Sequence, residues 1–68
     1  MLDKKLLKAE MVKNGFTQEK LAKVIGVTPR TFTNRLKTGD FGSKEIEVMI
    51  NVLRLDDPMS IFFADKVT

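Results

Sequence analysis

Apolar residues recur along the chain at spacings of three and four, which is the period of a helix with one buried face. The clearest example occupies positions i, i+3, i+4 and i+7 of one segment: Ile46, Met49, Ile50 and Leu53. No stretch alternates apolar and polar residues for long enough to predict a strand. The pattern predicts an all-α chain in one domain, residues 1–68, with five helices at about 3–14, 18–25, 29–37, 44–54 and 58–64.

Short polar side chains and glycines mark where these helices begin and end. Side chains that can accept a backbone N–H stand at four predicted starts: Thr17, Thr28, Ser43 and Asp57. Proline follows two of them, at the first helical position, where its missing N–H costs nothing: Pro29 and Pro58. Glycine, which adopts the left-handed backbone that stops a helix, stands at three predicted ends: Gly15, Gly26 and Gly39.

The second and third helices, with the turn between them, form a helix-turn-helix pattern. Ala22 is small enough to let the two helices cross closely, Gly26 tolerates a positive φ, and Val27 can fill the corner. Five further residues are predicted to point inward from the two helices: Leu21, Val24, Ile25, Phe32 and Leu36. The opposite face of the third helix is then wholly polar, so it is free to meet another molecule.

Charge is distributed unevenly between the two parts of the chain. Residues 1–44 carry ten Lys and Arg against four Asp and Glu, a balance of +6, whereas residues 45–68 carry two against five, a balance of −3. Around the helix-turn-helix this asymmetry has the form of an electrostatic footprint for a polyanion, although surface lysines also serve solubility alone.

Composition excludes several kinds of function. The chain has no cysteine and no histidine, so it offers no disulfide, no thiolate metal site and no imidazole base. The adjacent Asp56 and Asp57 precede Pro58 and fit helix capping better than paired acid-base catalysis. We therefore expect no enzyme activity, no metal and no cofactor. No segment has the pattern of a signal peptide or a membrane span, which predicts a soluble, cytoplasmic protein without a membrane partner.

The stretch TQEKLAKVIGVTPRTFTNRLKTG, residues 17–39, resembles the lambda-repressor-like, Cro-type helix-turn-helix family. NGFTQ and SKEIEVMINVL extend the resemblance, and PMSIFFADKV is similar to the ends of small Cro-like proteins from bacteriophages. The resemblance implies a compact five-helix DNA-binding domain that represses transcription in a bacterial host cell by occupying double-stranded operator DNA. In this family the third helix enters the major groove, and its first residues reach base edges.

The resemblance assigns roles to the polar residues of the pattern. Arg30 can pair with guanine, Asn34 with adenine, and the hydroxyl or methyl groups of two threonines with nearby base edges, so the readout candidates are Arg30, Thr31, Thr33 and Asn34. The candidates for phosphate contact are Thr17, Gln18, Thr28, Lys37, Ser43 and Lys44. If about five phosphates are neutralised per monomer, the slope of log affinity against log salt lies near −4 to −5.

Several features depart from the family pattern, among them Pro29, Arg35 and Asp40. Pro29 stands where many members carry a base-reading polar side chain, which limits it to apolar contact with a thymine methyl. Arg35 stands where the motif usually has an apolar residue. Asp40 lies in the loop expected to approach phosphate, and its carboxylate repels DNA unless it points away or caps a turn.

Three consecutive large apolar residues near the end cannot all face the core, so at least one is exposed in a monomer: Ile61, Phe62 and Phe63. Either one of them is an isolated exposed aromatic over the core, or the three form a small interface for a homodimer or for another protein. The second possibility leaves an alternative function open, in which the protein acts as an antirepressor or modulator by binding a partner repressor.

Overall fold

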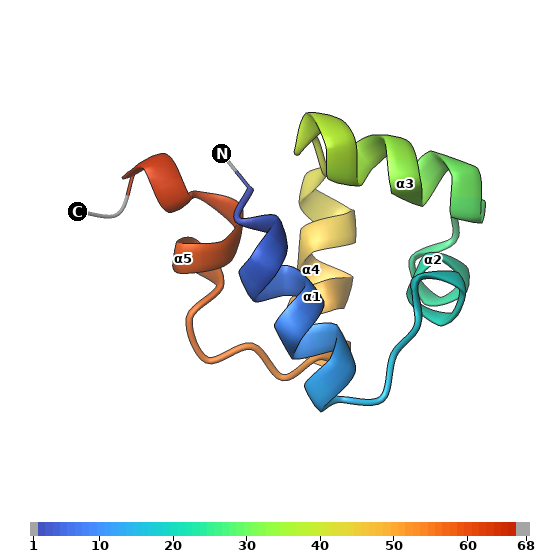
Figure 1. The fold of residues 1–68 in the computed structure, drawn as a ribbon, viewed down its shortest axis with the longest axis horizontal. Helices are drawn as coiled ribbons and strands as arrows, with labels where there is room; N and C mark the ends of the chain where they lie inside the picture. Colours follow the sequence, from blue (N-terminus) through green and yellow to red (C-terminus); the bar gives the residue numbers. More distant parts are fainter. Residues whose placement is uncertain (1, 67–68) are drawn as a thin grey trace.

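The computed structural model describes residues 2–66, and within them every regular element is helical (Figure 1). The elements follow in the order α1 (Lys4–Lys13), α2 (Gln18–Ile25), α3 (Pro29–Thr38), α4 (Ser43–Val52) and α5 (Pro58–Phe62), with a final 3-10 turn at Ala64–Lys66. The prediction of an all-α chain with five helices is therefore confirmed.

The helices enclose one core. α2 packs against α3 and α4, and α5 packs against α1, so that α3 and α5 lie on different sides of the molecule (Figure 1). The backbone N–H of Asp3 donates to the carbonyl of Ile61 at 2.7 Å, which joins the start of α1 to α5. The buried core consists of Leu2, Leu7, Met11, Leu21, Ala22, Phe32, Leu36, Phe41, Met49, Leu53, Leu55, Ile61 and Phe62.

Most helix ends lie where the capping residues and glycines of the sequence predicted them. The hydroxyl of Thr17 accepts the N–H of Lys20, and the carboxylate of Asp57 accepts the N–H of Ser60, so both residues are N-caps as predicted. Gly26 adopts φ +93° and ends α2 in the left-handed conformation that a side chain would strain. Its N–H donates to the carbonyl of Ala22 at 2.9 Å, which closes the helix.

The prediction of Ser43 as a cap was wrong. Ser43 is the first residue of α4, and Gly42 is the N-cap. The N–H of Gly42 donates at 2.9 Å to the Glu45 carboxylate, which reaches back from the third position of the helix. A glutamate thus closes this helix start in place of the serine hydroxyl.

Two apolar positions also differ from the prediction. Val24 was expected to face inward but is 47% exposed, because Ala22 occupies the buried position beside Leu21 where α2 crosses the core. At the end of the chain, Ile61 and Phe62 are buried and Phe63 is 40% exposed. The expectation that at least one of the three apolar residues is exposed is confirmed, and Ile61 and Phe62 belong to the core.

An aromatic row anchors α3 and α5 in this core. The ring centroids of Phe32 and Phe41 lie 5.6 Å apart at a tilted angle, and those of Phe41 and Phe62 lie 6.4 Å apart edge to face. Such pairs stabilise beyond the area that they bury. The row connects α3 through the following loop to α5, so the position of α3 is tied to the core.

Candidate nucleic-acid interface

The helix-turn-helix holds α3 at the surface by its two inward residues. Phe32 is fully buried and Leu36 is 5% exposed, whereas the side chains around them on α3 are polar. Val27, in the turn, packs partly buried against the core, as its predicted role at the corner requires. The burial of Phe32 and Leu36 therefore leaves the other face of α3 open to solvent.

The first turn of α3 is ordered by Thr28 and Pro29. The hydroxyl of Thr28 accepts the N–H of Thr31 at 3.1 Å and donates to the hydroxyl of Thr31 at 2.9 Å, while Pro29 occupies the first turn as predicted. Because Thr31 accepts that bond, its own hydroxyl proton remains available to an incoming acceptor. Thr28 is already engaged twice within the helix.

The four readout candidates differ in what they can offer to a base edge. Thr33 donates its hydroxyl to the carbonyl of Pro29 at 3.0 Å, so it presents an acceptor lone pair and a methyl group outward. Within residues 2–66, no hydrogen bond or ion pair engages the side chain of Arg30 or of Asn34, and both side chains are exposed. Arg30 and Asn34 are thus the candidates whose full hydrogen-bonding capacity is free.

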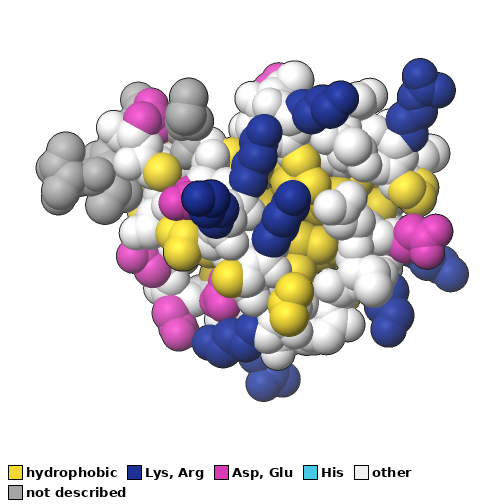
Figure 2. Space-filling view, viewed as in Figure 1, with side chains coloured by type: hydrophobic (Ala, Val, Ile, Leu, Met, Phe, Trp, Pro, Cys, Tyr) yellow, Lys and Arg dark blue, Asp and Glu magenta, His cyan; other side chains and the backbone are white. Residues whose placement is uncertain are grey.

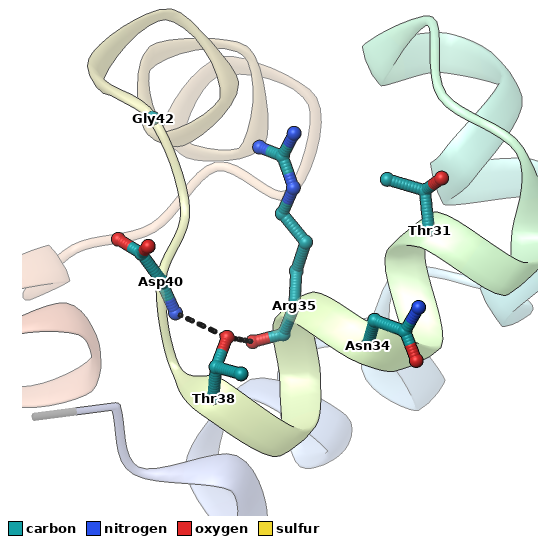
Figure 3. Close-up of a pocket in the computed structure, with 6 residues that line it drawn as sticks. All are labelled: Thr31, Asn34, Arg35, Thr38, Asp40 and Gly42. Atoms are coloured by element: carbon teal, nitrogen blue, oxygen red, sulfur yellow. Dashed lines mark hydrogen bonds between the residues drawn. The ribbon is translucent and has the colours of Figure 1, made fainter.

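An open groove of about 370 Å³ runs between α3 and the loop that follows it (Figure 3). Its lining residues are Thr31, Asn34, Arg35, Thr38, Asp40 and Gly42. In Figure 3, Thr31 and Asn34 come from α3 and Asp40 lies across from them on the loop. Two predicted readout residues therefore share a recess with an acidic residue, Asp40.

Asp40 does not cap a turn. Its backbone N–H donates to the hydroxyl of Thr38 at 3.2 Å, and its side chain is exposed at the groove. A carboxylate there repels phosphate and can accept a hydrogen bond from the amino group of cytosine. Asp40 consequently places a negative charge in the groove beside α3.

Arg35 is engaged within the protein and is not a free cation. Its guanidinium, one-third exposed, donates from Nη1 to Oε1 of Glu45 on α4. The same Glu45 oxygen accepts the N–H of Gly42, so one carboxylate ties α3, the loop and the start of α4 together. Sequence reasoning missed this connection. The only signal was a glutamate three residues after Gly42, and nothing in the spacing indicated Arg35 as its second partner.

Truncating Glu45 should loosen that connection. We expect Glu45→Ala to lower the free energy of unfolding by about 1 to 2 kcal/mol, because both a helix cap and a partly buried ion pair are lost. Glu45→Gln keeps an acceptor for Gly42 and should lose about half as much. Urea denaturation of the three proteins measures the difference. Glu47→Ala, at an exposed position of the same helix, is the matched control, and an equal loss in that variant would contradict the role of Glu45.

Apart from Thr28, which caps the start of α3, the phosphate candidates fall into two places. Lys37 is exposed near the end of α3, and α4 begins beside that end, which brings Ser43 and Lys44 to the same region (Figure 1). Thr17 and Gln18 lie at the start of α2 beside the last turn of α1, where they line a recess with Lys8 and Val12. No hydrogen bond among the described residues joins Gln18 to α3. Figure 2 shows Lys and Arg side chains standing out around α3, in keeping with the charge asymmetry of the sequence.

Comparison with protein families decides what this helix-turn-helix is. A family model described as bacterial regulatory protein, Fis family, matches residues 1–38, which are more than half of the chain and end with α3. The chain belongs to this Fis family. It is therefore a helix-turn-helix regulator of transcription that binds DNA with sequence specificity.

No curated protein and no solved structure matches this chain. Regulators of the Fis helix-turn-helix family are generally not enzymes, in agreement with the expectation from composition. None of the helices within residues 2–66 has the length and apolar character needed to cross a bilayer.

Proposed function

We propose that this Fis-family protein is a Cro-like repressor of bacteriophage type, which occupies operator DNA with α3 in the major groove. The observation that carries the proposal is the outer face of α3, where Arg30 and Asn34 are exposed and unengaged on a helix anchored by Phe32 and Leu36. A fixed helix with free donors and acceptors suits the reading of base edges.

Within this proposal, side chains of α3 specify the sequence and the surrounding polar groups position the helix. Arg30 pairs with O6 and N7 of guanine, Asn34 pairs with adenine, and Thr31 and Thr33 meet neighbouring edges. The groups that position the protein on phosphates are Thr17, Gln18, Thr28, Lys37, Ser43 and Lys44. Because the hydroxyl of Thr28 already makes two hydrogen bonds within the protein, we expect Thr28 to contribute least of these residues to phosphate binding.

A second candidate function is modulation of a partner repressor by protein contact. Asp40 favours it, because its exposed carboxylate, across the groove from Asn34, opposes a close approach of phosphate. A homodimer on a palindromic operator is also proposed, and Phe63 is the residue of the apolar tail that is exposed enough to take part.

Selection from a pool of random duplexes, followed by fluorescence titration, separates the two functions. The repressor proposal expects one enriched motif, bound at least a thousandfold more tightly than random DNA, and a salt slope near −4 to −5 per monomer. Stoichiometry on the enriched duplex shows whether one or two copies bind. Absence of sequence-selective binding at moderate salt and micromolar protein would reject the repressor in favour of the modulator.

A further inference from the structure

Away from α3, a second recess lies between α1 and the start of α5, with a volume of about 270 Å³. We name it the α1–α5 groove. Its lining combines three apolar residues, which we call the floor, with three acidic residues, which we call the rim, and Ser60: Leu6, Ala9 and Ile61 are apolar, and Glu10, Asp56 and Asp57 are acidic. An apolar floor with an acidic rim distinguishes it from the polar groove beside α3.

The floor includes apolar surface that the folded chain leaves uncovered. Leu6 is 43% exposed, although Leu7 and Met11 on the same helix are buried. α1 therefore presents a second apolar position on the side that faces α5, beyond the stripe that anchors it in the core. Covering Leu6 would add burial that this small chain does not supply itself.

The carboxylates of the rim are placed by the fold. Both carboxylate oxygens of Asp57 accept hydrogen bonds from Ser60, one from its N–H at 3.3 Å and one from its hydroxyl at 2.6 Å. Glu10 meets Lys13 at 3.9 Å, a long contact to a side chain that is 71% exposed. Figure 2 shows acidic side chains gathered over α5 and the segment that leads to it, with Lys and Arg side chains nearby as well as around α3.

The sign of this charge restricts what can cover the groove. The three carboxylates repel nucleic acid and anionic lipid. A segment in which Lys or Arg stands beside an apolar side chain can pair its charge with these carboxylates and pack its apolar side chain on the apolar lining. Val24 of a second copy, between Lys20 and Lys23, has this character. That contact is head to tail, however, and would build open chains of molecules rather than a closed pair.

We propose that the α1–α5 groove docks a helical segment of another protein, in which an apolar side chain is flanked by Lys or Arg. None of the residues that line the groove belongs to α3, and the two lie on different sides of the molecule (Figure 1). The chain can therefore hold this partner while α3 is on DNA. The docking site goes beyond the proposed repressor function and does not depend on it.

Amide NMR spectra of the labelled full chain test the proposal with two short helical peptides of equal length, one of Leu and Lys and one of Leu and Glu. The Leu/Lys peptide should shift the amides of residues 6–10, 56, 57 and 59–61 and leave those of residues 30–38 in α3 in place. The Leu/Glu peptide should shift none of them. Equal shifts with both peptides, or the largest shifts outside the groove, would overturn the proposal.

Two matched variants sharpen the test. Leu6→Gln should lower the affinity for the Leu/Lys peptide about tenfold, because one partly exposed apolar contact is lost. Val12→Gln, at a position of α1 that is 79% exposed and outside the groove, should bind like the parent. Equal weakening in both variants would count against the groove.

Sedimentation and DNA titration keep the other outcomes apart. If the parent chain associates with itself and Leu6→Gln abolishes that association, a second copy covers the groove and the proposal is wrong. Leu6→Gln should keep the parental affinity for DNA. Failure of the chain to select any DNA, with peptide shifts still confined to the groove, would reject the repressor function and support the docking site.

Discussion

Phe32→Ala should remove about 3 to 5 kcal/mol from the free energy of unfolding, the largest loss that we expect from one substitution in α3. Phe32 is fully buried and its ring packs against Phe41 with centroids 5.6 Å apart. The total free energy of unfolding of a 68-residue domain is about 3 to 10 kcal/mol, so much of the Phe32→Ala population would be unfolded. DNA affinity should fall with it, because the unfolded fraction presents no recognition helix.

Thermal and urea unfolding, followed by the helical circular dichroism signal, measure this loss. Phe63→Ala removes the same ring from a position that is 40% exposed and should cost less than about 1 kcal/mol. A similar cost for both variants would show that the aromatic row does not anchor α3. At low temperature, where the folded fraction of Phe32→Ala is greatest, its DNA specificity should approach that of the parent.

Arg30→Ala should weaken binding to the selected operator by about 1 to 3 kcal/mol, roughly five- to 150-fold, and relax the preference for one base pair. Arg30 is exposed in the first turn of α3, and its guanidinium has no partner among the described residues. Its removal should therefore change DNA recognition with little effect on stability. Titration of the operator and of its single-base variants measures both the affinity and the preference.

Lys37→Ala is the matched control at the other end of α3. It should weaken all duplexes alike and reduce the salt slope by about one, because a phosphate contact carries charge but no sequence information. If Arg30→Ala lost equal affinity on operator and random DNA, Arg30 would belong with the phosphate contacts and not with the readout residues.

The elements that the sequence predicted best are those whose signals are local. Thr17 and Asp57 cap the helices that follow them, and Gly26 ends α2, because each effect depends on backbone groups within four residues. Phe32 and Leu36, one turn apart, marked the inner side of α3 for the same reason. The helix-turn-helix is built from such local signals, and it is also the part that the family model matches.

The predictions that were wrong depend on neighbours distant along the chain. Val24 fits the helical period of α2, but the crossing of α2 with α3 and α4 buries Ala22 and leaves Val24 exposed. Ser43 is an ordinary capping residue, yet Glu45 closes α4 through Gly42. The end of α4 also carried no glycine signal, because Arg54 takes the left-handed backbone there with φ +51°.

The amino-acid sequence by itself determined the helices, the helix-turn-helix and the polar outer face of α3, since capping and helical periodicity act over a few residues. Only the tertiary structure decided which charged side chains are paired within the protein and which surfaces the others face. It joined Arg35 to Glu45, ten residues away, placed Asp40 across the groove from Asn34, and brought Leu6 next to α5. These arrangements depend on how helices pack on a shared core, and no local pattern of residues encodes that packing.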